Sequence, residues 1–250
     1  RLIQSLDRGI QILLFLAEKS CAGITELAEA LDVDKSTASR LVETLRARDM
    51  VRLDPETKKY RLGFRILHLG EALKDNLNVI AIARPILTEL SCQINESVHF
   101  CAFNNNLVYV MDQVRSSKNY ALSATVGMVE PFHCSSVGKC ILAFRRPETI
   151  RALLENYEFT KYTEHTITTK ETLQENLERI RALGYALDDE EMALGVRCLA
   201  VPVYDYRNSV RYSIGVSGPK ANINSATMET YIKRMVEATR KLSAAIGSTR

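Results

Sequence analysis

The chain has 250 residues, 46% of them hydrophobic, and its formal net charge is only +3. A chain of this length and composition forms one large globular domain or two ordinary ones, with a substantial core. The longest apolar run, residues 12–17, is far too short to cross a bilayer and no signal peptide is visible, so we expect no membrane partner. The cysteines are scattered without a Cys-x-x-Cys pair, which favours a reducing compartment and a cytoplasmic protein.

The first predicted helix runs from Ser5 to Glu18. Its apolar residues recur at helical spacing and predict a face that packs behind the helices that follow. Such a helix would complete a three-helix core. The side chains expected to face inward are Leu6, Ile10, Leu13, Leu14 and Ala17.

Residues 24–48 predict two helices joined by a tight turn, because apolar residues recur at helical spacing over 24–31 and again over 38–45. Asp34, in the turn, is placed to cap the second helix. The opposite face of that helix carries short hydroxyl side chains and one arginine. This suits a helix that enters a major groove, where hydroxyls reach phosphates and base edges and arginine reads guanine. The expected DNA contacts are Lys35, Ser36, Thr37, Ser39, Arg40 and Thr44.

A predicted hairpin follows, with strands at 50–53 and 60–63 around the turn 54–59. A helix pair followed by a basic-tipped hairpin indicates a winged helix-turn-helix rather than an ordinary helical hairpin with a solvated face. Between Lys35 and Arg65, nine Lys and Arg stand against four Asp and Glu, a local surplus of five that favours phosphate contact. The wing residues expected to contact DNA are Lys58, Lys59 and Arg61.

The rest of the chain alternates helical and strand patterns. An amphipathic helix at 64–76 reads as an interdomain linker that packs against a partner subunit, or alternatively as part of one domain. The later elements indicate an α+β domain of sensor size. We expect helices at 80–94, 136–145, 147–157, 170–183 and 225–246, a loop at 127–135, and strands at 97–103, 107–114, 120–126, 185–188, 198–204 and 211–216.

Several motifs, in this order and spacing, resemble the IclR family of bacterial transcriptional regulators. They are SLDRGIQILLFLAE, ITELAEALDVDKSTASRLVETL, KKYRLGFRILHLG, HCSSVGKCILAF, GYALDDEEMALGVRCLAVPVYD and YSIGVSGP. The resemblance implies an α+β protein with a winged helix-turn-helix DNA-binding domain at 1–64, a linker helix at 65–78 and a GAF-like effector-binding domain at 79–250, a curved sheet flanked by helices. It also implies homodimers, often paired into tetramers, on palindromic operator double-stranded DNA. We expect a repressor controlled by a small organic or aromatic acid.

The loop-to-helix junction around Ser136 is the first candidate for the effector site. Free backbone N–H groups at a helix start favour an anion, so a carboxylate could dock on the amides of Ser136, Val137 and Gly138. The glycine-rich phosphate-binding pattern is missing here. The alternative is a simple helix cap made by Ser135 or Ser136.

The resemblance adds further pocket positions, namely Asp188, Cys198, Gly215 and Ser217. Gly215 departs from the small hydroxyl residue that some members carry, which removes a donor and leaves more room. We also expect Val196 and Leu122 as apolar walls and His133 at the pocket mouth. Lys139 is expected to be structural or on the surface, and the acidic run 189–191 to be a solvated face.

Two other functions were weighed. A metal-responsive regulator could use His133, Cys134, Asp188 and Cys198, whose side chains suit zinc but lack any short-range ligand spacing. A hydrolytic enzyme could draw a nucleophile and base from the same region, together with Ser136 and Cys140, but no G-x-S-x-G elbow is present. We therefore expect no catalytic residue, no metal and no cofactor.

Overall fold

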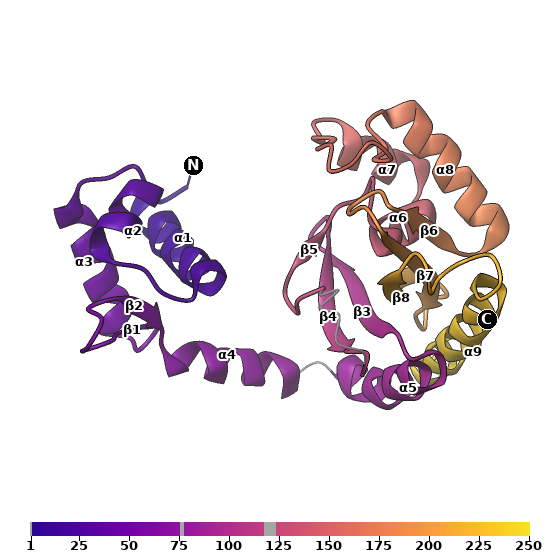
Figure 1. Ribbon diagram of the computed structural model, residues 1–250, viewed down its shortest axis with the longest axis horizontal. Coiled ribbons are helices and arrows are strands. Elements are labelled where there is room, and N and C mark those ends of the chain that lie inside the picture. The colour runs from indigo at the N-terminus through magenta and orange to yellow at the C-terminus, as the bar shows by residue number, and fades with distance from the viewer. Residues whose placement is uncertain (1, 76–77, 118–123) are drawn as a thin grey trace. The chain divides into compact units, whose positions relative to one another are not determined.

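The computed structural model describes residues 2–75, 78–117 and 124–250 (Figure 1). The chain divides into two compact units, Arg1–Asn78 and Val79–Arg250. Within the described ranges, no helix combines the length and apolarity that a bilayer crossing requires.

The first unit is three helices followed by a two-stranded antiparallel hairpin and a further helix. Its core is formed by side chains from the first three helices and the first strand, including Ile12, Leu16, Leu27, Val42 and Val51. The hairpin register pairs Val51 with Leu62 and Leu53 with Tyr60. The elements are α1 (Gln4–Lys19), α2 (Ile24–Ala30), α3 (Lys35–Arg46), β1 (Val51–Leu53), β2 (Tyr60–Leu62) and α4 (Phe64–Asp75).

Asp34 starts α3, as the sequence predicts. Its carboxylate accepts hydrogen bonds from the Thr37 amide at 2.9 Å and from the hydroxyls of Ser36 at 2.6 Å and Thr37 at 2.7 Å. These hydrogen bonds hold the pKa of the Asp34 carboxyl well below its usual range. The cap supplies a partner to a helix amide that would otherwise have none.

The predicted inner face of α1 is wrong. Leu6, Ile10 and Leu14 are 62%, 48% and 65% exposed, and Ala17 is exposed as well. The core instead takes Ile12 and Leu16, which lie on another side of the same helix. Apolar residues occupy two faces of α1, so helical spacing alone could not decide which face packs inward; Leu13 is half-buried between the two.

The second unit is built on a six-stranded antiparallel sheet in the order β5-β4-β3-β8-β7-β6. The strand pairings among its described residues are all antiparallel. Its strands are β3 (Ser97–Asn104), β4 (Leu107–Val114), β5 (Val129–Glu130), β6 (Ala186–Asp189), β7 (Val196–Tyr204) and β8 (Val210–Pro219). Its helices are α5 (Asn78–Ile94), α6 (Ser136–Ala143), α7 (Pro147–Leu154), α8 (Lys170–Leu183) and α9 (Met228–Ala245).

Helices cover both faces of this sheet (Figure 1). α5 and α9 pack on one face, where their side chains meet alternate residues of the central strands such as Val98, Ile214 and Val216. α6 and α8 pack on the other face, against residues such as Cys101 and Ala200. The mixed α+β fold expected from the sequence is confirmed, and the second face is the one that carries the candidate site.

One predicted strand is not where we expected it. Most of the segment 120–126 lies outside the described residues, and its described part, 124–126, is not a strand. The edge strand is β5, two residues within the segment predicted to be a loop, and it pairs with β4 through Val108 and Tyr109. Periodicity over so few residues carries no signal, so the tertiary pairing decides. By contrast, α8 has the predicted bounds, and Gly184 ends it at φ 78°.

Two glycines of the first unit, Gly63 and Gly70, give a matched test of how closely the chain packs around each of them. A Cβ on Gly63 would lie 2.0 Å from the Asp49 carbonyl oxygen, whereas a Cβ on Gly70 would meet nothing within 4 Å. We predict that Gly63→Ala destabilises the first unit by about 1–3 kcal/mol through overpacking. Gly70→Ala should be neutral or stabilising by up to ~1 kcal/mol, since glycine weakens a helix interior.

Thermal unfolding of the full-length variants, followed by circular dichroism, measures both effects. Equal melting temperatures for the two variants would contradict the close approach of Gly63 to Asp49.

Candidate functional site

A cavity of about 150 Å³ lies between the start of α6 and the sheet. Polar and apolar side chains share its wall, and several of the polar ones are buried. Ser136, Val137, Asp188, Val196, Cys198 and Ser217, all expected from the sequence, lie together here. The lining also includes residues that sequence reasoning missed: His99, Ala124, Met128, Glu130, Ser135, Met192 and Ala193.

Strand register explains how distant residues reach this cavity. Across β3, β8, β7 and β6 the pairs are Ser97 with Ser217, Ser217 with Cys198, and Cys198 with Asp188. Directly paired residues project from the same face of a sheet. Ser217, Cys198 and Asp188 therefore form one polar row beneath the start of α6.

The start of α6 forms the opposite wall. The Ser135 hydroxyl accepts a hydrogen bond from the Gly138 amide at 3.0 Å and donates one to the Pro131 carbonyl at 2.8 Å. The cap is therefore Ser135, and the Gly138 amide is already occupied. A Cβ on Gly138 would lie 2.1 Å from the Pro131 oxygen, so Gly138 serves close packing and does not line the cavity. In the described part of the chain, the amides of Ser136 and Val137 have no acceptor and remain free for a ligand.

A network of buried charged residues next to the cavity supports its wall. The Lys139 ammonium is fully buried, forms an ion pair with Glu191 and donates to the Leu187 carbonyl at 2.7 Å. Asp188 accepts a hydrogen bond from the Glu191 amide at 2.7 Å. Lys139 is therefore structural rather than on the surface, and the expectation that Glu191 is solvated is wrong: a long-range partner, invisible in the sequence, draws it inward.

Burial perturbs the carboxyl groups here. It raises the pKa of Asp188 to about 6, and the opposing effects of the Glu191 amide and Lys139 are smaller. Burial also raises the pKa of Glu130. The pKa of Glu191 is likewise raised by burial, against the influence of Lys139. The cavity thus contains carboxyl groups that take up protons more readily than ordinary ones.

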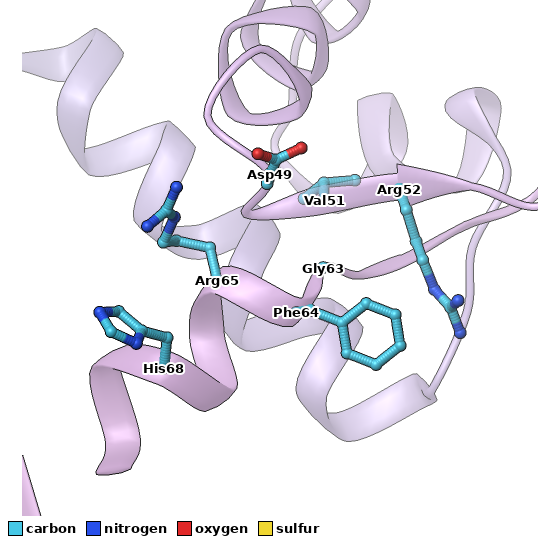
Figure 2. Close-up of a pocket in the computed structure, with 7 residues that line it drawn as sticks. All are labelled: Asp49, Val51, Arg52, Gly63, Phe64, Arg65 and His68. Atoms are coloured by element: carbon cyan, nitrogen blue, oxygen red, sulfur yellow. The ribbon is translucent and has the colours of Figure 1, made fainter. Parts of the chain in front are cut away.

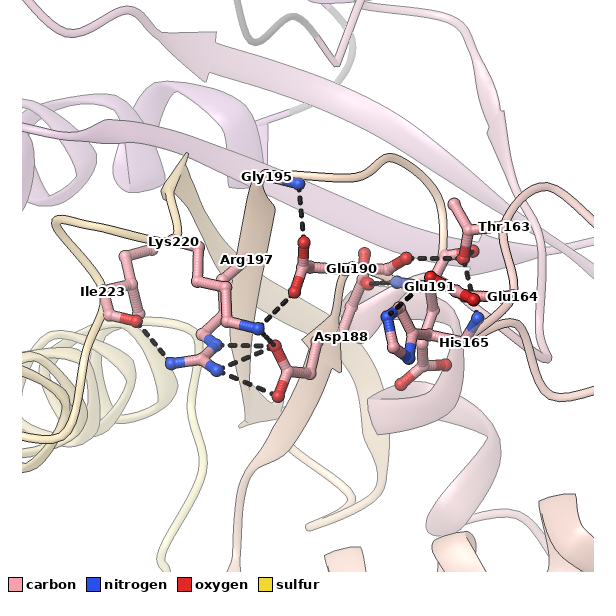
Figure 3. Close-up of polar contacts among 11 residues, drawn as sticks. Thr163, Glu164, His165, Asp188, Glu190, Glu191, Gly195, Arg197, Lys220 and Ile223 are labelled. Atoms are coloured by element: carbon pink, nitrogen blue, oxygen red, sulfur yellow. Dashed lines mark hydrogen bonds and ion pairs between the residues drawn. The ribbon is translucent and has the colours of Figure 1, made fainter.

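The loop between β6 and β7, which contributes Met192 and Ala193 to the cavity wall, is tied down on both sides (Figure 3). On one side the hydroxyls of Thr163 and Thr166 each donate at 2.6 Å, to the carbonyls of Glu190 and Glu191 respectively. On the other side Arg197 donates to both carboxylate oxygens of Asp189 and to the Ile223 carbonyl at 2.8 Å.

Further contacts fix the outer edge of this loop. Lys220 pairs with Glu190, and the Gly195 amide donates to the Glu190 carboxylate at 2.8 Å. Of the acidic run, Glu190 and Asp189 thus face outward into ion pairs, while Glu191 faces inward.

Gly215 does not leave the extra room that its sequence suggests. A Cβ added there would lie 2.2 Å from His99 Nε2 and 2.6 Å from Val137 Cγ1. Other side chains fill that space, and Gly215 itself does not line the cavity. The sequence did contain a signal for His99. Alternation along the predicted strand 97–103 places its side chain on the same face as Ser97 and Cys101.

His133 is not at the cavity mouth. Its ring is buried, with Nδ1 2.9 Å from the Tyr157 hydroxyl and Nε2 2.9 Å from the Thr160 carbonyl. The rings of Tyr157, Phe159 and Tyr162 surround it. Leu122, the other expected lining residue, lies outside the described residues.

The residues weighed as a metal set or as a nucleophile and base do not form such a site. Both ring nitrogens of His133 already have protein partners. Burial raises the pKa of the Cys134 and Cys198 thiols, which disfavours the thiolate needed for zinc binding or nucleophilic attack. Among the residues that the structure describes, no three His, Cys, Asp or Glu side chains are grouped to hold a metal ion.

The residues expected to contact DNA lie on the first unit. Lys35, Ser36, Ser39, Arg40 and Thr44 are exposed on α3. Thr37 is half-buried, and its hydroxyl donates to Asp34.

In the hairpin, Lys58 is exposed at the tip. Lys59 lies 3.8 Å from a Glu26 carboxylate oxygen, and Arg61 lies 3.5 Å from one of Asp54. These two cations therefore have acidic partners that compete with any phosphate.

A second concavity, of about 420 Å³, lies on the first unit between β1 and the start of α4. Figure 2 shows Phe64 and Arg52 on one side of it and Arg65 and His68 on the other. The Arg52 guanidinium lies 5.1 Å from the centre of the Phe64 ring. These four side chains are exposed, whereas buried polar groups converge on the smaller cavity at α6, which we take as the ligand site.

Comparisons with known proteins agree with both halves of this description. The family model described as IclR helix-turn-helix domain matches residues 5–55, and the one described as Bacterial transcriptional regulator IclR C-terminal matches residues 71–244. The chain belongs to the IclR family. Its members are transcriptional regulators with a DNA-binding helix-turn-helix, many of them repressors, and are not enzymes.

Individual relatives cover nearly the whole chain. It is 31% identical to the HTH-type transcriptional regulator KdgR of Escherichia coli, over 98% of this chain and 93% of that one. It is also 31% identical to the Transcriptional repressor IclR of the same organism, over 99% of this chain and 92% of that one. The crystal structure of an IclR transcriptional regulator from Alicyclobacillus acidocaldarius superposes with a TM-score of 0.85 at 25% identity, covering 99% of this chain and 100% of that one.

The buried carboxyl of Asp188 gives a pH test of the cavity. Because burial raises its pKa from 3.8 to about 6, the folded protein binds this proton more tightly than the unfolded chain. Stability therefore falls as pH rises through that window, and the full penalty remains above it. We predict that Asp188→Asn gains thermal stability relative to the parent protein as pH rises from 4 to 7, with the gain levelling off above.

Differential scanning fluorimetry of both proteins across this range measures the gain as a difference. Taking the difference removes the contribution of His99 to the pH dependence of stability. Burial lowers the pKa of His99 to about 4, so its contribution makes stability rise with pH, opposite to that of Asp188. Asp49→Asn, at an exposed site, controls for charge removal. Parallel curves for Asp188→Asn and the parent protein would refute the raised pKa.

Proposed function

We propose that this protein is a cytoplasmic repressor whose grip on operator DNA changes when a small organic or aromatic acid binds in the cavity at α6. The observation that carries the proposal is that one chain of this family has both an exposed helix face suited to DNA and a cavity suited to an organic acid. The face of α3 presents hydroxyls and a guanidinium to solvent. The cavity offers free amides beside buried polar side chains.

The face of α3 suits a major groove. Ser36 and Ser39 are small enough for close approach. The Ser39 hydroxyl can donate to a phosphate or base edge, whereas the Ser36 hydroxyl already donates to Asp34 and can only accept. Arg40 is exposed one turn into the helix, where a guanidinium can pair with guanine. Lys58 is exposed at the wing tip and adds a cation that can meet a phosphate.

We predict that Arg40→Ala weakens specific DNA binding by about tenfold or more, since one good base contact is worth ~1–3 kcal/mol of discrimination. Arg179→Ala removes the same charge from an exposed position of α8 in the second unit and serves as the control. Fluorescence anisotropy on a duplex selected from a random pool, at fixed salt, gives both affinities. Unchanged affinity for Arg40→Ala would remove α3 from the recognition surface.

The cavity suits an anion with a polar body. The amides of Ser136 and Val137 can bind a carboxylate at the positive end of α6. Ser217 supplies a hydroxyl and Cys198 a polarizable wall, both from the row on the sheet. Asp188 can face such an anion only when it is protonated or when it accepts a hydrogen bond from a ligand hydroxyl.

This electrostatic arrangement predicts proton-linked binding. A carboxylate entering beside Asp188 favours the protonated form of its carboxyl, so affinity for an acid should rise as pH falls from 8 to 6. Thermal shift with acetate, butanoate, 2-oxobutanoate and benzoate at both pH values measures it, because a specific binder raises the melting temperature. Ser217→Ala should weaken the shift while leaving DNA affinity intact, as should Ser136→Trp, which fills the cavity.

The absence of a shift from any acid in the panel, at either pH, would count against a small acid as effector. A shift that grows toward pH 8 would instead indicate that Asp188 stays ionised in the complex.

Self-association completes the proposal. A palindromic operator requires two copies related by a two-fold axis, as a homodimer or a dimer of dimers. The exposed apolar side chains Leu6, Ile10 and Leu14 of α1 support a partner copy on the first unit.

A further inference from the structure

A second row of paired residues crosses the sheet beside the polar row. His99 pairs with Gly215, Gly215 with Ala200, and Ala200 with Ala186, on strands β3, β8, β7 and β6. These residues project toward α6, as their neighbours Ser217 and Cys198 do two positions along the strands. Three of the four have small side chains or none, and His99 is the large exception.

The His99 imidazole lies across Gly215. A Cβ on Gly215 would be 2.2 Å from Nε2 and 2.7 Å from Cε1 of that ring. Gly215 does not have a positive φ, so its backbone conformation would accept any residue. Glycine is required at position 215 because the His99 ring and Val137 occupy the space that a Cβ would take. His99 and Gly215 therefore form a steric pair. Because Gly215 has no side chain, the His99 imidazole can occupy the space above it and reach the cavity wall.

The ring also has unused hydrogen-bonding capacity. His99 is 3% exposed, and its Nδ1 is buried without a hydrogen-bond partner in the described part of the chain. A buried polar atom left unpaired destabilises the folded protein. Burial lowers the pKa of His99 to about 4, so the ring is neutral near pH 7 and holds one N–H donor and one acceptor nitrogen. Glu130 and Asp188, both buried, line the same cavity.

We propose that His99 contacts the effector and sets its selectivity, by pairing with a hydroxyl or oxo group beside the ligand's carboxylate. Gly215 is the permissive partner that lets the imidazole lie there. The inference rests on the proposed effector site, and it adds a ligand class: small acids with an oxygen next to the carboxylate, in preference to plain aliphatic acids. A neutral imidazole suits either oxygen, because it can donate to an oxo group or accept from a hydroxyl.

The first experiment tests, without any ligand, whether the His99 ring occupies the space above Gly215. Gly215→Ala is made in the parent protein and in a His99→Ala background, and the melting temperatures of all four full-length proteins are compared. We expect Gly215→Ala to lower the melting temperature clearly in the parent and much less once the ring is gone. An equal loss in both backgrounds would show that His99 does not occupy the space above Gly215 and would overturn the inference.

The second experiment tests selectivity with three acids of nearly equal size: butanoate, 2-hydroxybutanoate and 2-oxobutanoate. Isothermal titration on the parent protein should give an affinity for one of the oxygenated acids about five- to tenfold above that for butanoate, the worth of one hydrogen bond. His99→Leu should keep butanoate binding and lose most of the preference. His99→Gln, which can still donate and accept, should retain part of it.

The outcomes separate the two claims. An unchanged preference in His99→Leu would overturn the role of His99 while leaving the effector site standing. Failure of all three acids to bind the parent protein would overturn the effector site for this ligand class, and the selectivity role with it.

Discussion

The second unit depends on one buried ion pair, between Lys139 of α6 and Glu191 of the β6–β7 loop. Lys139 is fully buried, and taking an ammonium out of water costs several kcal/mol unless a partner and further hydrogen bonds offset the penalty. Glu191 and the Leu187 carbonyl supply them. The pair therefore fixes the loop against the helix. That loop carries Met192 and Ala193 and follows Asp188 of β6, so the pair helps to hold the cavity wall in place, together with the contacts made by Thr163, Thr166 and Arg197.

Around that pair, the cavity combines features that favour opposite charges. The amides at the start of α6 favour an anion, while Asp188 and Glu130 are buried carboxyl groups whose pKa values burial raises. Proton uptake reconciles them, since a protonated carboxyl can donate to the same ligand oxygen that an amide binds. His99 Nδ1, which has no hydrogen-bond partner among the described residues, is a further polar atom that a ligand could satisfy. A site left partly unsatisfied in this way loses stability without ligand and gains selectivity with it.

Local signals in the sequence predicted the parts that local chemistry decides. Asp34 as a cap and the bounds of α8 with its closing Gly184 could be placed before the fold was known. Asp188, Cys198 and Ser217 were expected only because the sequence resembles the IclR family, and strand register is what aligns them. What failed depended on distant partners. Lys139 and Glu191 find each other across the chain, His99 and Gly215 meet through strand register, and the inner face of α1 is chosen by the helices and the strand that pack on it. Strand β5 is too short to show any periodicity.

The proposed regulation works only through differential affinity: a ligand can shift DNA binding no further than its own preference between two arrangements of the protein allows. The most direct test is the affinity of the intact protein for a selected duplex, with and without a saturating amount of an acid that stabilises it. We expect a change of about fivefold or more, the lower end of ordinary coupling. An acid that occupies the cavity and leaves DNA affinity unchanged would contradict it.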